Sequence, residues 1–283
     1  MGDINKINSK NTYLLKKPSV ISLLEFINKT EEVIDVLSMN LWDIFQVGID
    51  ISYWIAFQDL FESCNRVLCS IKECIKIGNF PDAIMLTRKY RDDIIFYFCS
   101  ALNASDYITS TIEGTKPDKE KRKGIDQWMG NERGSFSVSN AVDNEFSKDE
   151  RLKEFFIKFN IPKQCGEFNT KLNRFVHSKG FAYINHPALF YQRNPQVLEE
   201  MCAIIKNAIQ FFSVLFIALE SIINPCSVAS SDYVDSLDNG LEPEVGSQYW
   251  VAPIIKTYFK ENGKILGDGL IDYMKSFTSM EFE

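Results

Sequence analysis

His177 lies in the part of this sequence whose residue types are best suited to chemistry on a phosphate group. The segment KLNRFVHSKG, residues 171–180, contains one of only two histidines in the chain. Histidine has an ordinary pKa near neutrality, so it can accept and donate a proton at physiological pH. Arg174 lies three residues before it, and an arginine can hold a phosphate and stabilise developing negative charge. These residues indicate a candidate site for phosphodiester chemistry.

A helical wheel of residues 166–179 leaves two interpretations of His177 open. Asn173 and His177 lie almost opposite the centre of an apolar stripe, and Arg174 and Lys171 take the remaining flank. The stripe consists of Phe168, Leu172, Phe175 and Val176. In the first interpretation His177 is exposed in the last helical turn, where the helix dipole favours a charged imidazole. In the second it faces a cleft and acts together with the polar residues around it.

A second set of charged residues lies on an earlier predicted helix, residues 81–102. Arg88 and Asp92 are four residues apart and share one face. Within about 60° of that face, at 100° per residue, are Met85, Ile95 and Cys99. We expect this pair to be partly buried, either as a structural lock or as part of a site, because buried charges need further hydrogen bonds. Lys89 and Asp93 repeat the spacing on a face expected to be more exposed, as an ordinary surface pair.

Helices are expected to position these residues, because apolar side chains recur at intervals of three and four along most of the chain. The pattern predicts helices over residues 18–46, 51–77, 81–102, 152–159, 166–179 and 195–223. Ser147 and Glu150 have the spacing of a capping box at the start of the fourth helix. The helix over 195–223 is apolar nearly all round, which predicts that the other helices enclose it.

The expected fold is all-α: a multi-helix bundle around a central apolar helix, with a C-terminal helical appendage. The 14 glycines and 9 prolines cluster between the periodic segments, which also favours helices over many short strands. The predicted organisation is a flexible N-terminal arm over 1–17, the bundle over 18–225, a linker over 226–248 and the appendage over 249–283.

The charge distribution argues against a broad nucleic-acid-binding surface. The net charge is −7, and ten acidic against four basic residues from Asp232 onward account for −6 of it. A local basic patch remains possible at Lys116–Lys123, where five of the eight residues are lysine or arginine. The longest apolar run, residues 208–219, is shorter than a membrane span requires. We therefore expect a cytoplasmic protein with no membrane partner.

No cofactor or metal site is expected from the motifs. The sequence lacks a Walker loop, a GxSxG, an HExxH and a glycine-rich dinucleotide fingerprint. Cys64, Cys69 and Cys74 are five residues apart, so in a helix each thiol is rotated by about 140° from the one before it. The three thiols then point in different directions and cannot share one metal ion.

Two segments of the chain together resemble HEPN-like helical bundle proteins. These are LTRKYRDDIIFYF, residues 86–98, and LNRFVHS, residues 172–178, and the resemblance covers roughly residues 50–225. Members of this superfamily are often metal-independent ribonucleases of toxin–antitoxin, abortive-infection and other antiviral systems. Others are non-catalytic modules that bind RNA or protein. The resemblance also implies a homodimer, because the family commonly builds its cleft across a two-fold axis.

The family motif is an arginine followed, after four to six residues, by a histidine. His177 matches that histidine, Asn173 lies in the intervening stretch, and Asp92 matches the acidic residue of the earlier helix. The chain departs from the motif because Arg174 is only three residues before His177, and Lys171 stands six residues before it. The resemblance thus implies His177 as general acid and base, Arg174 and Lys171 as phosphate-binding residues, and Asp92 as an orienting residue together with Arg88.

The expected function is that of a HEPN-like metal-independent RNA endonuclease, or a degenerate relative, in a bacterial defence or toxin–antitoxin role. RNA is then the expected substrate, and an antitoxin is a possible partner protein. The alternative is a non-enzymatic helical protein-interaction module, in which the acidic C-terminal part and the 226–248 segment make the contact. Convergence of His177 with Arg88 and Asp92 in a cleft would favour the enzyme.

Overall fold

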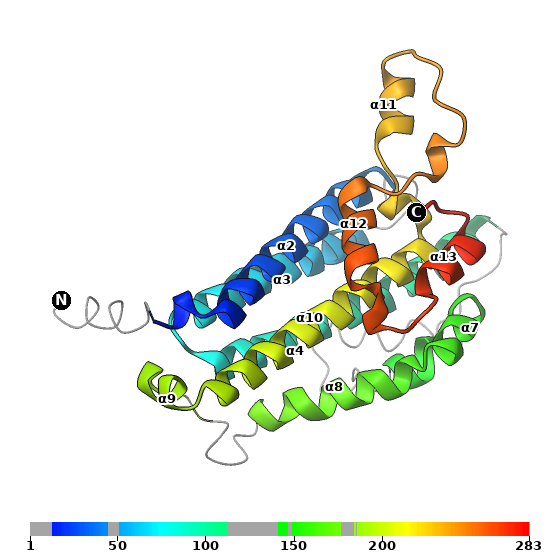
Figure 1. Ribbon diagram of the computed structural model, residues 1–283. Coiled ribbons are helices and arrows are strands. Elements are labelled where there is room, and N and C mark those ends of the chain that lie inside the picture. Colours follow the sequence, from blue (N-terminus) through cyan, green and yellow to red (C-terminus); the bar gives the residue numbers. More distant parts are fainter. Residues whose placement is uncertain are drawn as a thin grey trace.

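The computed structural model describes residues 13–44, 51–112, 141–146, 149–176, 184 and 186–282. Across these ranges the protein is an all-α bundle without strands, as the sequence predicted (Figure 1). The long central helix is also confirmed. His177 and the basic stretch Lys116–Lys123 lie outside the described residues.

Three long helices form the first half of the bundle: α2 (Pro18–Ile44), α3 (Ile51–Lys76) and α4 (Phe80–Ile112). Gly78 separates α3 from α4 with φ of +78°, a left-handed conformation that glycine adopts without steric cost. The side chain of Asn79 then caps α4, because its oxygen accepts from the backbone N–H of Asp82 at 3.3 Å. The predicted helices agree with these bounds, except that α4 continues ten residues beyond the predicted end at 102.

Helices α7 (Glu150–Lys158) and α8 (Ile161–Val176) follow one another along the outside of the bundle. Asn160, with φ of +50°, forms the joint between them. The N-cap of α7 is Asp149, whose carboxylate accepts from the backbone N–H of Arg151 at 2.9 Å. The helix is therefore capped by the single residue Asp149 and not by the predicted capping box of Ser147 and Glu150. Ser147 lies outside the described residues.

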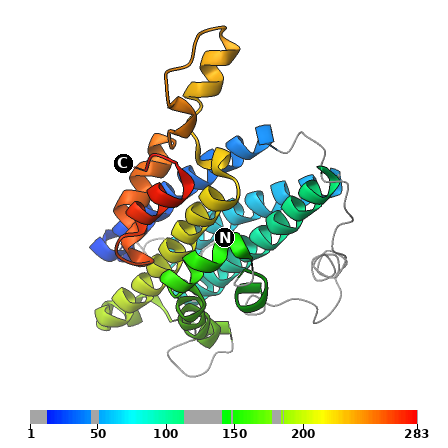
Figure 2. The ribbon, with the colours of Figure 1, turned by 90° about the vertical axis from the view of Figure 1, so that its right-hand side faces the viewer.

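Helix α10 (Pro195–Ile223) runs through the middle of the molecule, between α12 and α13 on one side and α3 and α4 on the other (Figure 2). The last three turns are buried all round, from Phe211 to Ser221. By length and composition α10 could cross a membrane. The sequence analysis had counted only the apolar run 208–219, which is shorter than a membrane span requires. The most apolar stretch of α10 is 72% buried inside the bundle, where the other helices already cover the surface that lipid would contact.

The C-terminal part of the chain packs onto the bundle. Helices α12 (Pro253–Asn262) and α13 (Leu270–Thr278) contact α10, and α12 also contacts α2. Ile255, Phe259 and Met274 are fully buried in the same core as α10. The expected appendage is thus part of the main core, and the expected linker contains α11 (Asp232–Asp238) with short 3-10 turns on either side.

Two tyrosines connect four helices through hydrogen bonds in this core. Ser213 of α10 donates its hydroxyl proton to the carbonyl oxygen of Ile209. Its Oγ is therefore left as the acceptor for the hydroxyl of Tyr90 of α4, at 2.7 Å. Tyr258 of α12 makes the same kind of bond to Thr30 of α2, at 3.0 Å. All four side chains are buried, and burial raises the pKa of Tyr90 well above its ordinary value. These bonds satisfy polar atoms that would otherwise destabilise an apolar core.

Glu220 is a buried acid near the C-terminal end of α10. Its side chain has no exposed surface, and burial raises its pKa to about 7, while the nearby hydroxyls of Ser227 and Tyr97 lower the pKa only in part. Below pH 7 the folded protein therefore holds this proton, which an unfolded chain releases near pH 4.5.

We expect Tyr90→Phe to lower the free energy of unfolding by about 1 kcal/mol, the usual net value of one buried hydrogen bond. The ring stays buried and Ser213 keeps its own bond to Ile209, so packing is unchanged. Urea denaturation of the variant and the wild type measures the difference. Tyr13→Phe at an exposed ring is the control, and equal losses for both variants would contradict this role of the Tyr90 hydroxyl.

The stability contribution of Glu220 should depend on pH. Because its folded pKa is raised above the unfolded value, stability is highest below about pH 4.5 and falls as pH rises to about 7. The shift corresponds to roughly 3 kcal/mol. Glu220→Gln should therefore gain stability relative to the wild type by about this amount between pH 4.5 and pH 8 in denaturant titrations. Glu200→Gln, at an exposed position of the same helix, is the control, and a pH-independent difference for Glu220→Gln would refute the raised pKa.

Candidate functional site

Arg91 is the central residue of the polar contact between α4 and α8, and the sequence analysis did not single it out. Its guanidinium group is nearly buried, with 3% exposure. Nε donates to Asp92 Oδ1 at 2.9 Å, and Nη1 donates to the side-chain oxygen of Asn169 on α8. Arg91 therefore joins the two helices that carry the predicted site residues. A helical wheel could have indicated Arg91, because it lies only about 60° around the helix from Arg88 and so is near the face that carries Arg88 and Asp92.

The pKa values of the central ion pair show what burial costs there. Burial lowers the pKa of Arg91 and raises the pKa of Asp92, while the attraction between the two groups opposes both shifts. The pair is stabilised because Nε and Nη2 of Arg91 both donate to Asp92 and Nη1 donates to Asn169. Arg91 is thus held by three hydrogen bonds to side chains.

Arg88 has weaker bonds than the sequence suggested. Its Nε lies 3.9 Å from Asp92 Oδ2, and the side chain is one-third exposed. The same Nε atom is inaccessible to solvent and makes no hydrogen bond. The predicted pairing of Arg88 with Asp92 is therefore loose. The Asp92 carboxylate accepts its close hydrogen bonds from Arg91.

Asn173 lies on the flank of α8 that also carries Asn169, one turn closer to the C-terminal end. The expectation that it lies opposite the buried face was wrong: the side chain is half-buried, and its Oδ1 has no exposed surface and no hydrogen-bond partner. Helices α4 and α8 run in opposite directions (Figure 1). The next turn of α8 after Asn169 therefore faces the turn of α4 before Arg91, which carries Arg88. The residues Arg88, Arg91, Asp92, Asn169 and Asn173 are called the polar seam below.

Lys171 and Arg174 lie elsewhere on α8 than the polar seam. Both are exposed, and they are rotated by about 160° and 100° around the helix from Asn173. The ammonium group of Lys171 lies 5.6 Å from the centre of the Phe168 ring, and that ring packs on Phe211 of α10. The structure therefore brings Arg88 and Asp92 together on α4 and places Asn173 one turn after Asn169, which Arg91 contacts, whereas these two cations lie on other sides of α8.

His177 lies directly after the described end of α8. In the sequence it follows Asn169 by eight residues and Asn173 by four. A helical continuation would place these three residues along one flank, because four residues advance a helix by about 40° beyond a full turn. Its role therefore stays a prediction.

The pair Lys89 and Asp93 is more buried than the sequence analysis expected. The Asp93 side chain is only 7% exposed, and Lys89 Nζ donates to its two oxygens at 2.7 and 2.9 Å. Ser63 of α3 donates to the same carboxylate at 2.7 Å. The expectation of an ordinary surface pair was wrong, because Asp93 points into the contact between α3 and α4. This cluster fastens α3 to α4.

The second histidine has a packing role. His186 precedes Pro187, is buried, and stacks its ring on that of Phe190 with 3.8 Å between the ring centres. Among the described residues, no three histidine, cysteine, aspartate or glutamate side chains gather in a way that could hold a metal ion. Of the equally spaced cysteines, Cys64 is buried and Cys69 is exposed.

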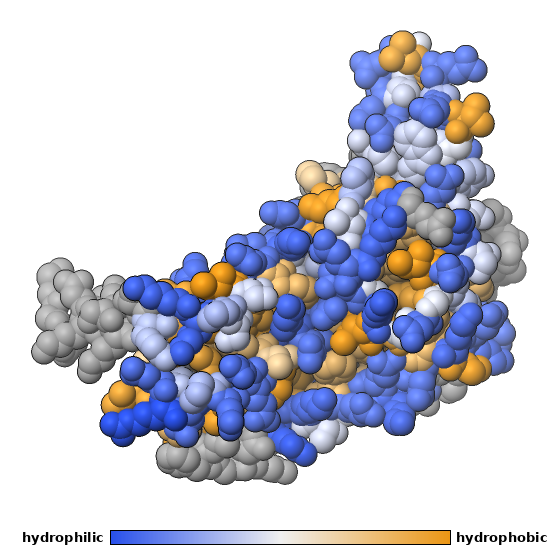
Figure 3. All heavy atoms as spheres, viewed as in Figure 1, coloured by the Kyte–Doolittle hydropathy of each residue, from blue (hydrophilic) through white to orange (hydrophobic). Residues whose placement is uncertain are grey.

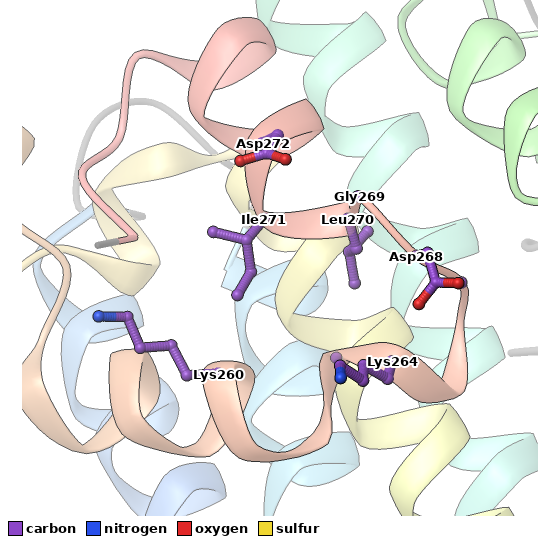
Figure 4. A pocket seen from close by; sticks show the side chains of 9 residues that line it. Lys260, Lys264, Asp268, Gly269, Leu270, Ile271 and Asp272 are labelled. Carbon is purple, nitrogen blue, oxygen red and sulfur yellow. The ribbon is translucent and has the colours of Figure 1, made fainter.

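A surface hollow of about 400 Å³ lies between α12 and α13 (Figure 4). Lys260 and Lys264 line one wall, and Asp268 and Asp272 line the other. The two signs of charge balance, and none of the predicted site residues lines this hollow. The polar seam is therefore the better candidate site of the two, since it combines buried charge with unpaired polar atoms and the hollow does not.

Replacement of Arg91 by alanine should cost about 3 kcal/mol of unfolding free energy, because Asp92 would remain buried without its partner. Arg88→Ala should cost less than about 1 kcal/mol, since its contact with Asp92 is long and partly exposed. Guanidinium denaturation of the two variants tests this order. A larger loss for Arg88→Ala would mean that Arg88, and not Arg91, fixes the seam.

Comparisons with known proteins give no relative for this chain. No protein-family model, no curated protein and no solved structure matches it.

Proposed function

We propose that the polar seam binds RNA and that the protein cleaves it without a metal ion, with His177 as general acid and base. The observation that carries this proposal is the pair of unpaired polar atoms, Arg88 Nε and Asn173 Oδ1, beside a fixed ion pair. A buried polar atom without a partner costs free energy, and a ligand that supplied the partner would remove that cost.

The two unpaired atoms suit different parts of a ribonucleotide. Arg88 is a cationic donor, which fits a phosphate oxygen and stabilises the charge that develops during cleavage. Asn173 Oδ1 is an acceptor, which repels phosphate but accepts a hydrogen bond from a ribose 2′-hydroxyl. The 2′-hydroxyl is the group that distinguishes RNA from DNA. Arg91 joins the two helices that carry these residues through its bond to Asn169.

Cleavage needs only one proton-transfer group in this scheme. The neutral imidazole of His177 removes the proton from the 2′-hydroxyl, and the 2′ oxygen attacks the adjacent phosphorus. The bond to the 5′ oxygen breaks, and the imidazolium returns the proton to that leaving oxygen. The products are a 2′,3′-cyclic phosphate and a free 5′-hydroxyl. Lys171 and Arg174, on the other flank of α8, hold more distant phosphates.

The biological role that fits this activity is a toxin or antiviral effector. Cleavage of cellular RNA stops growth or phage replication, and such an enzyme must be restrained until a trigger arrives. This role follows from the proposed chemistry and from the resemblance to HEPN-like proteins.

Incubation of the purified protein with total RNA in EDTA tests the activity. His177→Ala should lose at least about 100-fold in cleavage rate, as expected for loss of a general acid and base. Arg88→Ala should lose a similar factor, because a donor to developing charge contributes about as much. Arg174→Ala should lose less than about tenfold, since it supplies a single peripheral phosphate contact.

Three controls keep the result interpretable. The variants must have the wild-type melting temperature, and the matched 2′-deoxy oligonucleotide must resist cleavage. The 3′ fragments must carry a 5′-hydroxyl. Metal-free cleavage that survives in His177→Ala, or no cleavage by the wild type over the full concentration range, would refute the proposal. Equal losses for Arg174→Ala and Arg88→Ala would overturn the assignment of the phosphate site to the seam.

A further inference from the structure

Residues 230–249 form an ordered projection that stands away from the helical body (Figure 1, Figure 2). It contains α11 and the chain that returns to the body through the turn at Ser247–Tyr249. We call these residues the acidic arm. None of the α11 residues is buried, so the core of the bundle does not use them.

Hydrogen bonds hold the arm in one shape. At its base, Ser230 donates its backbone N–H to the carbonyl oxygen of Trp250 at 2.7 Å. At its tip, Leu241 donates to the carbonyl oxygen of Ser236 at 2.9 Å, which closes α11 around Gly240 with φ of +67°. The arm therefore presents a preformed surface, and binding requires little ordering entropy.

Large apolar side chains are exposed along this arm. Val245 is 98% exposed and Leu241 is 64% exposed. The others, about half exposed, are Val234, Leu237 and Tyr249. Figure 3 shows apolar atoms on the arm among hydrophilic ones. Apolar residues concentrated on a projection without a structural role mark a contact surface.

The charges on the arm select the kind of partner. It carries five carboxylates and no lysine, arginine or histidine. The carboxylates are those of Asp232, Asp235, Asp238, Glu242 and Glu244. Nucleic acids and anionic membranes would be repelled by this charge. A protein surface with an apolar groove and a rim of lysine and arginine complements both properties.

We propose that the acidic arm docks into an apolar groove of a partner protein whose rim is lined by lysine and arginine. The apolar side chains supply the affinity, and the carboxylates select the partner and accelerate encounter. This contact is independent of RNA cleavage, because none of the polar-seam residues lies on the arm. It provides a place where a regulator can bind without covering the seam.

A displayed library of random peptides, selected on the full-length protein, tests this proposal. The selected peptides should combine apolar residues with lysine or arginine, and their binding should weaken as salt is raised. A triple variant with Leu237→Ser, Leu241→Ser and Val245→Ser should weaken binding at least about tenfold. A second variant with Asp235→Asn, Asp238→Asn and Glu242→Gln should reduce the salt dependence, because two of the five carboxylates remain. Asp232 is left unchanged because Ser230 bonds to its carboxylate.

Ile157→Ser is the matched control, since Ile157 is 72% exposed but lies on α7; it should bind the peptides as the wild type does. All variants should keep the wild-type melting temperature. Selected peptides that bind the arm variants as tightly as the wild type, or that lack cationic residues, would overturn the proposal. Arm-dependent dimerisation of the wild type in analytical ultracentrifugation would also overturn it, because the occupant would then be a second copy of the chain.

Discussion

The structure depends on covering α10 from every side. A helix whose last three turns are buried all round cannot be stable in water unless other helices enclose it. Helices α2, α4, α12 and α13 all contact it, so segments from both halves of the chain and from the C-terminal part complete one core. This requirement explains why the C-terminal helices belong to the bundle, although the sequence between them and α10 is polar.

The buried parts of the protein also contain polar groups, and two sets of them differ in how completely their hydrogen bonds are satisfied. The hydroxyls of Tyr90, Ser213, Tyr258 and Thr30 pair with one another or with backbone carbonyls. The polar seam pairs some of its groups tightly and leaves others without a partner. A fully paired network stabilises the fold, whereas each unpaired buried polar atom of the seam costs free energy.

Local patterns in the sequence sufficed for the fold class but not for the site. The all-round apolarity of residues 195–223 predicted a central helix, because no other arrangement buries such a helix. A wheel could also place Arg88 and Asp92 on one face. The wheel could not show that Arg91 contacts Asn169 of α8, or that Asp93 contacts Ser63 of α3. These two contacts depend on which helices become neighbours in the fold. The order of residues 226–248 was missed for a similar reason: it comes from backbone bonds at the base of the arm, which composition does not reveal.

The late position of α10 in the chain has a consequence for synthesis. Helices α2, α3 and α4 leave the ribosome before the helix that they must cover, with about 110 residues between the end of α4 and the end of α10. At roughly 5–20 residues per second this interval lasts on the order of ten seconds. During that time α2, α3 and α4 can pack on one another, but the faces of α2 and α4 that contact α10 in the finished protein are uncovered. Transiently exposed apolar surface favours aggregation, so the chain is more prone to aggregate during this interval than after α10 is complete.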